Sequence, residues 1–131
     1  MKNKYSLFTL FLFGIVLIIG AGCHSDKGSP QNLLDRYFSS AIRQDYAATY
    51  ACYYKAYKAK VNMDEYIRHR KEASVLKAYA VKSISQQGDT AEAQVELTFD
   101  KSQKLKRDRP VTALVKEDMV RESGEWKIKV W

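Results

Sequence analysis

Apolar residues spaced three and four apart predict a helix that begins at Pro30. Ser29 and Pro30 are a typical N-cap and a typical first helical residue. The apolar stripe stops at 43–45, where Asp45 can cap a second helix that we predict over 46–59. The first stripe consists of Leu33, Leu34, Tyr37, Phe38, Ala41 and Ile42.

A third helix is predicted by its start signal. Asn62 and Glu65 stand three residues apart, as in a capping box. Val61 and Tyr66 occupy the positions of a hydrophobic staple around that cap. The helix should run to about Glu72.

After the helices the apolar spacing changes from three and four to two, which is typical of strands. The first predicted strand covers 76–85 and ends at a Gly88–Asp89 turn. The second has one apolar and one polar face, so we expect an antiparallel sheet with a single covered face. Its apolar residues are Ala91, Ala93, Val95, Leu97 and Phe99.

A two-residue turn at Ser123–Gly124 predicts the register of the last hairpin. This register keeps apolar residues on one face and places an opposite-charge pair on the other. The predicted pairs are Arg121 with Trp126, Met119 with Ile128, Glu117 with Val130, and Asp118 with Lys129.

The N-terminus carries a secretory signal. Lys2 and Lys4 precede an uncharged apolar run, and Gly20, Ala21 and Gly22 stand directly before Cys23. This arrangement resembles the lipobox of bacterial lipoproteins, although Gly20 replaces the Leu preferred there. The resemblance implies that residues 1–22 are removed as a signal peptide and that a lipid is attached to Cys23.

An uncleaved transmembrane helix and a conventional signal peptide are the alternatives. Each of them places the rest of the chain outside the cytoplasm. Under the lipoprotein interpretation, residues 23–30 form a short polar tether and 31–131 a single domain. His24 follows the cysteine, which in a Gram-negative host resembles cargo of the outer membrane.

Net charge narrows the range of partners. The chain carries +7, and the loss of Lys2 and Lys4 with the signal peptide leaves +5. Export makes nucleic acid a poor partner for this charge, whereas anionic lipid headgroups or envelope polymers fit it better. The basic stretch 101–109 offers such a contact, and a simple role in solubility is the alternative.

The chain has two cysteines, Cys23 and Cys52. With Cys23 acylated, Cys52 has no disulfide partner, and we expect a small buried hydrophobic residue rather than a nucleophile. Without acylation, a Cys23–Cys52 bridge is the alternative. No sequence pattern indicates a metal site or a cofactor.

Candidate binding residues come from the second helix and the third strand. Tyr50, Tyr54 (or Tyr53) and Tyr57 follow one face of the predicted helix and give a large apolar surface with polar tips. Such a face lines a ligand cavity or forms part of the core. Glu117 stands on the apolar face of the last hairpin, so its carboxylate is buried, lies at the rim, or pairs with Arg121 or Lys82.

The whole pattern resembles the nuclear transport factor 2-like (cystatin-like) superfamily. The stretch 37–57, the four strands after it and the closing Gly124–Ile128 carry the resemblance. It implies an α+β fold in which three N-terminal helices pack on a curved, four-stranded antiparallel sheet that forms a cone with a pocket inside. Some members are isomerases, dehydratases or cyclases, but none of their catalytic residues maps onto a position here.

We therefore expect a membrane-anchored envelope domain that binds a small apolar ligand or an envelope protein, with Tyr50, Tyr54, Tyr57 and Glu117 at its pocket. The alternative is an isomerase- or dehydratase-like enzyme with Glu117 as base and a tyrosine hydroxyl as proton donor. A spacer or regulatory module of a cell-wall complex is a third hypothesis.

Overall fold

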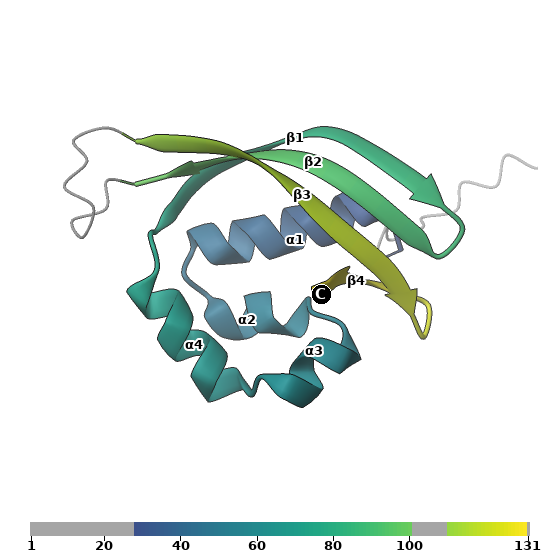
Figure 1. Cartoon of the computed structure of the whole chain (residues 1–131), viewed down its shortest axis with the longest axis horizontal. Coiled ribbons are helices and arrows are strands. Elements are labelled where there is room, and N and C mark those ends of the chain that lie inside the picture. The colour runs from purple at the N-terminus through teal and green to yellow at the C-terminus, as the bar shows by residue number, and fades with distance from the viewer. Residues whose placement is uncertain (1–27, 101–109, 131) are drawn as a thin grey trace, which may run out of the picture.

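The computed structural model describes residues 28–100 and 110–130, and within them four helices precede four strands (Figure 1). Residues 1–27, which include the predicted signal peptide and Cys23, and the basic stretch 101–109 lie outside the described residues, so the predictions on them stay predictions. The elements are α1 (Pro30–Ile42), α2 (Tyr46–Ala51), α3 (Lys55–Lys60), α4 (Met63–Glu72), β1 (Leu76–Gln87), β2 (Thr90–Phe99), β3 (Val111–Glu122) and β4 (Glu125–Lys129).

The predicted helix starts are confirmed by their side-chain caps. The Ser29 side chain accepts a hydrogen bond from the Asn32 amide, and Asp45 accepts one from the Ala48 amide. The Asn62 side chain caps α4 in the same way. Each cap satisfies a backbone N–H group that the first turn of a helix leaves unpaired.

The prediction of one helix over 46–59 is wrong, because the chain leaves the helix at Cys52–Tyr54. There the Tyr54 amide donates to the Ile128 carbonyl (2.9 Å), and the Ile128 amide donates to the Cys52 carbonyl (2.8 Å). Tyr53 thus forms a parallel β-bridge with β4. A continuous helix would use these backbone groups internally, so α2 and α3 become separate helices.

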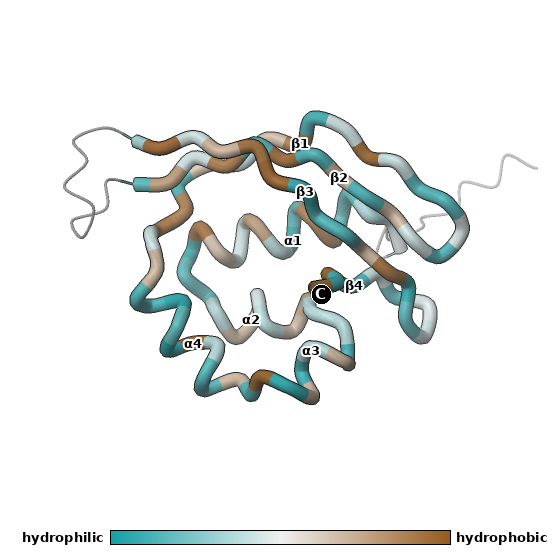
Figure 2. The backbone as a smooth tube through the Cα atoms, in the orientation of Figure 1, coloured by the Kyte–Doolittle hydropathy of each residue, from teal (hydrophilic) through white to brown (hydrophobic). Residues whose placement is uncertain are grey.

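The strands form one antiparallel sheet in the order β1-β2-β3-β4, as predicted. The sheet curves over the helices, and α1 lies beneath it (Figure 1). Hydrophobic and hydrophilic positions alternate along β2 (Figure 2). The inner residues Ala91, Ala93, Val95 and Leu97 are buried, which confirms the predicted covered face.

The last hairpin has the predicted register over its paired length. Ser123 and Gly124 both have positive φ angles, +49° and +81°, as a two-residue hairpin turn with right-handed twist requires. β4 ends at Lys129, so the predicted pairing of Glu117 with Val130 lies beyond the ladder. The confirmed pairs are Arg121 with Trp126, Met119 with Ile128, and Asp118 with Lys129.

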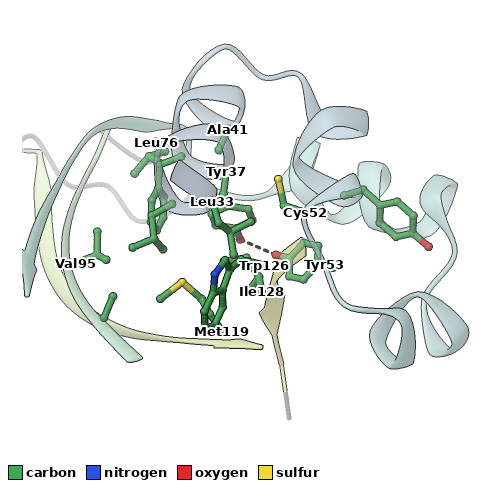
Figure 3. Packing of buried hydrophobic residues seen from close by; sticks show 14 of the residues in the cluster. Leu33, Tyr37, Ala41, Cys52, Tyr53, Leu76, Val95, Met119, Trp126 and Ile128 are labelled. Atoms are coloured by element: carbon green, nitrogen blue, oxygen red, sulfur yellow. Dashed lines mark hydrogen bonds between the residues drawn. The ribbon is translucent and has the colours of Figure 1, made fainter. Parts of the chain in front are cut away.

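The core lies between the sheet and the helices, and Figure 3 shows its side chains. Trp126 and Ile128 from β4, Met119 from β3 and Leu33 from α1 are almost fully buried. Cys52 is also buried (1% exposed), and its thiol donates to the Ala48 carbonyl. It packs as a small hydrophobic residue, as predicted.

Among the helices of the described residues, none combines the length and the apolar character needed to cross a membrane.

Candidate functional site

Glu117 points to the inner side of the sheet. It lies opposite Ala93 in the β2–β3 register, and Ala93 is 1% exposed. The Glu117 side chain is half-buried and has no hydrogen-bond or ion-pair partner among the described residues. Both cations considered as partners are engaged elsewhere: Arg121 pairs with Asp89 (3.7 Å), and Lys82 pairs with Glu96 (3.6 Å).

Burial changes the acidity of this carboxyl group. Loss of water contact, with a smaller contribution from the charge of Asp118, raises the pKa of Glu117 to about 7. An unpaired carboxylate in an apolar environment favours its neutral form. Glu117 therefore changes its charge close to neutral pH, where an ordinary glutamate is fully ionised.

Five of the tyrosines on the helical side of the core pack ring against ring, and we call these five the tyrosine cluster. They are Tyr37, Tyr50, Tyr53, Tyr57 and Tyr66. The Tyr37 and Tyr53 hydroxyls lie 2.6 Å apart and form a buried hydrogen bond (Figure 3). Tyr37 comes from α1, and Tyr53 comes from the break between α2 and α3.

The rings of the tyrosine cluster pack directly on one another. Tyr53 is central: Tyr57 stacks on it with ring centroids 4.5 Å apart, and Tyr37 and Tyr66 meet it edge-on at 5.6 and 5.4 Å. Tyr50 lies tilted against Tyr66 at 5.4 Å. Such offset and edge contacts are the favoured arrangements of aromatic rings. Tyr57 is the one member that is only partly buried.

Glu117 and Arg70 act on the tyrosine cluster with opposite charges. Burial raises the pKa of Tyr37, and the negative charge of Glu117 raises it further. Burial also raises the pKa of Tyr57 and Tyr66, whereas the positive charge of Arg70 opposes each increase. The pKa values of these tyrosines therefore depend on a carboxyl group on β3 and on a guanidinium group on α4.

Three buried polar atoms near the core have no hydrogen-bond partner among the described residues. They are the Tyr66 hydroxyl, Arg70 Nε and Trp126 Nε1. Buried polar groups are paired in the great majority of cases, and an unpaired one is costly.

The structure brings together two of the four predicted site residues, Tyr50 and Tyr57, in the tyrosine cluster. The Tyr50 hydroxyl donates to the Val61 carbonyl (2.7 Å). Glu117 lies on the inner side of the sheet, and its negative charge raises the pKa of Tyr37. Tyr54 does not belong to the cluster: its hydroxyl donates to the Val130 carbonyl (2.6 Å) near the end of the chain.

Sequence reasoning missed three members of this site. Tyr37 stands in the apolar stripe of the first helix, Tyr66 stands in the hydrophobic staple, and Arg70 stands in the basic run 68–71. Tyr53 was named only as the alternative to Tyr54. No signal in the sequence indicates that these residues meet, because the break at Cys52–Tyr54 depends on pairing with β4.

Among the described residues, no group of three or more His, Cys, Asp or Glu side chains could hold a metal ion. The available chemistry is a carboxyl group that titrates near neutral pH, hydroxyl groups of raised pKa and one guanidinium group.

No family model and no curated protein matches the chain. Among solved structures, it is similar to a SEC-C motif containing protein from Rhodopseudomonas palustris, with a TM-score of 0.66 and 13% identity over 79% of this chain and 77% of that one. An NTF2-like protein from Campylobacter jejuni aligns with a TM-score of 0.47 and 12% identity, over 76% of this chain and 97% of that one. The likeness shows the fold alone: α+β, with N-terminal helices on a four-stranded antiparallel sheet.

Proposed function

We propose that this protein is a membrane-anchored envelope lipoprotein whose domain binds a small, largely apolar ligand at the tyrosine cluster. The observation that carries the proposal is Glu117, a half-buried carboxyl group on the inner side of the sheet that has no partner among the described residues and whose charge raises the pKa of Tyr37. Ligand sites combine an apolar lining with a few polar groups that orient the ligand. The Tyr66 hydroxyl and Arg70 Nε add such groups.

Entry of a ligand requires a side chain to move, because the rings of the tyrosine cluster fill the space between them. Tyr57 is the partly buried member and stacks on Tyr53. Its outward rotation would expose the faces of Tyr53 and Tyr66 without disturbing the hydrogen bond between Tyr37 and Tyr53. A flat ligand with one hydrogen-bonding group suits this position.

The anchor is the sequence-based part of the proposal. The uncharged run before Cys23, with small residues at its end, supports cleavage there and lipid attachment to the Cys23 thiol. The domain would then be held at the envelope, facing the periplasm or the exterior. In a Gram-negative host, His24 favours the outer membrane.

The decisive experiment is native mass spectrometry of the protein extracted from its own membrane. We expect a diacylglycerol adduct on a chain that begins at Cys23, together with a retained small molecule. A Cys23→Ser variant should lose the adduct and keep the small molecule, since anchor and pocket are separate. A chain that is acylated but never retains a small molecule contradicts the ligand proposal, whereas an unacylated wild-type chain contradicts the anchor.

An acid–base enzyme of the isomerase or dehydratase type is the second candidate. The observation in its favour is the pKa of Glu117, about 7, which suits a general base at neutral pH. The raised pKa of Tyr37 makes its hydroxyl a hydrogen-bond donor rather than a source of a proton. Incubation of the retained molecule with wild type in D2O should then incorporate deuterium, and Glu117→Gln should not. Equal incorporation by both proteins excludes this role.

A further inference from the structure

An open cleft lies at the corner of the sheet next to the β1–β2 turn, away from the tyrosine cluster. Its volume is about 330 Å³. Four of its residues form one row across all four strands, because Ser85 pairs with Glu92, Glu92 with Asp118, and Asp118 with Lys129. The remaining lining residues are Gln87, Thr90, Ala91 and Met119.

The carboxylates of this cleft are held in place. Lys116 Nζ lies 3.2 Å from a carboxylate oxygen of Glu92 and 3.4 Å from one of Asp118. One ammonium group thus bridges two acidic side chains that project from neighbouring strands. A carboxylate has about four acceptor positions on its two oxygens, so this bridge alone does not fill the acceptor positions of Glu92.

The charges and hydrogen-bonding groups of the cleft indicate which class of ligand it can bind. Glu92 and Asp118 are matched by Lys116 and Lys129, so the cleft favours neither an anion nor a cation. Ser85 and Thr90 carry hydroxyls and Gln87 carries an amide, and each of these groups can both donate and accept. A dense set of donors and acceptors without net charge is complementary to a neutral ligand rich in hydroxyl groups.

We propose that this cleft binds a neutral saccharide. Its volume is at the small end of the range for ligand sites, which suits one or two sugar rings. Adjacent sugar hydroxyls can donate to the fixed Glu92 and Asp118 carboxylates and accept from Lys129 and Gln87. None of the lining residues is aromatic, so binding rests on hydrogen bonds and should be weak for a single disaccharide.

The test is calorimetric titration of the full chain in detergent micelles with maltose and with N,N′-diacetylchitobiose. We expect saturable binding of at least one disaccharide, weakened about tenfold or more by Asp118→Asn, because a charged acceptor is lost. Gln87→Ala, at an exposed position, should also weaken binding. Ser83→Ala is the matched control: it lies on the same face of β1, two residues from Ser85 and outside the cleft, and should bind like wild type.

Sedimentation with insoluble cell-wall glycan distinguishes a wall polymer from a free sugar as the source of the saccharide. Co-sedimentation that Asp118→Asn abolishes assigns the cleft to the polymer, whereas disaccharide binding without co-sedimentation assigns it to a soluble sugar. The proposal is overturned if neither probe binds, or if any binding is equal in wild type, Asp118→Asn and Gln87→Ala.

Discussion

The hydroxyl groups of Tyr37 and Tyr53 lie 2.6 Å apart inside the core and join α1 to the break between α2 and α3. Both side chains are almost fully buried. Each hydroxyl therefore depends on the other to offset its loss of water. Tyr37 also responds to Glu117, because the negative charge of Glu117 raises the pKa of the Tyr37 hydroxyl.

Removal of both hydroxyls of this pair should destabilise the protein by less than the sum of the two single removals. Tyr37→Phe and Tyr53→Phe each leave a buried hydroxyl without its partner, at an expected cost of about 1–3 kcal/mol. The double variant leaves neither, so its cost should be smaller than the sum of the single costs. Urea unfolding of the four proteins measures the coupling energy. Strict additivity would show that the two hydroxyls do not depend on each other.

Glu117 should make the protein less stable as pH rises from about 4.5 to 7. Its pKa is raised in the folded state, so over this interval the unfolded chain loses a proton that the folded chain retains. Below about pH 4.5 Glu117 is protonated in both the folded and the unfolded state, and above about pH 7 it is ionised in both. We expect a loss on the order of 2 kcal/mol, allowing for solvent screening at a half-buried group.

The Glu117→Gln variant provides the control for this pH dependence. Gln cannot ionise, so the difference in unfolding free energy between variant and wild type should change across the interval and become constant above pH 7. Urea unfolding at a series of pH values measures this difference. If the difference is the same at every pH, the pKa of Glu117 is not raised.

Substitutions in the turn at Ser123–Gly124 should change the stability of the protein only through the backbone conformation of the turn. Gly124 has a φ of +81°, and a Cβ added there would meet nothing within 4 Å. Gly124→Ala should therefore cost about 1–2 kcal/mol through the disfavoured φ and not through a clash. Ser123→Asn should stabilise by about 0.5 kcal/mol, since Asn tolerates the positive φ of this position better. Thermal unfolding of both variants should give midpoints on opposite sides of wild type.

The backbone pairing of Tyr54 with β4 should stabilise the break between α2 and α3. Tyr54→Pro removes the N–H group that donates to Ile128, while the φ of −71° at this position already suits proline. We expect a loss of about 1–2 kcal/mol. Tyr54→Phe is the control, because it keeps the amide and removes only the exposed hydroxyl, and should cost no more than about 0.5 kcal/mol. Equal losses in both variants would assign the effect to the hydroxyl.

The sequence was most informative where the determinants are local. Ser29, Asp45 and Asn62 start helices because their side chains reach amides three residues away. The alternation along β2 identified the covered face, since adjacent strand residues point to opposite sides. The Ser123–Gly124 turn determined the register of β3 and β4, because a slip of one residue would place their apolar side chains in water.

Tertiary structure decided the features that depend on distant segments. Residues 46–59 have the pattern of one helix, but Ile128 binds the backbone at Cys52–Tyr54 and divides it. The same break places Tyr53 against Tyr37 and turns Tyr54 toward Val130. Whether Glu117 has a partner depended on which neighbours Arg121 and Lys82 reach in the folded sheet. Local spacing thus determined the elements and the inner face of the sheet, whereas the tyrosine cluster exists because β4 returns to the helices.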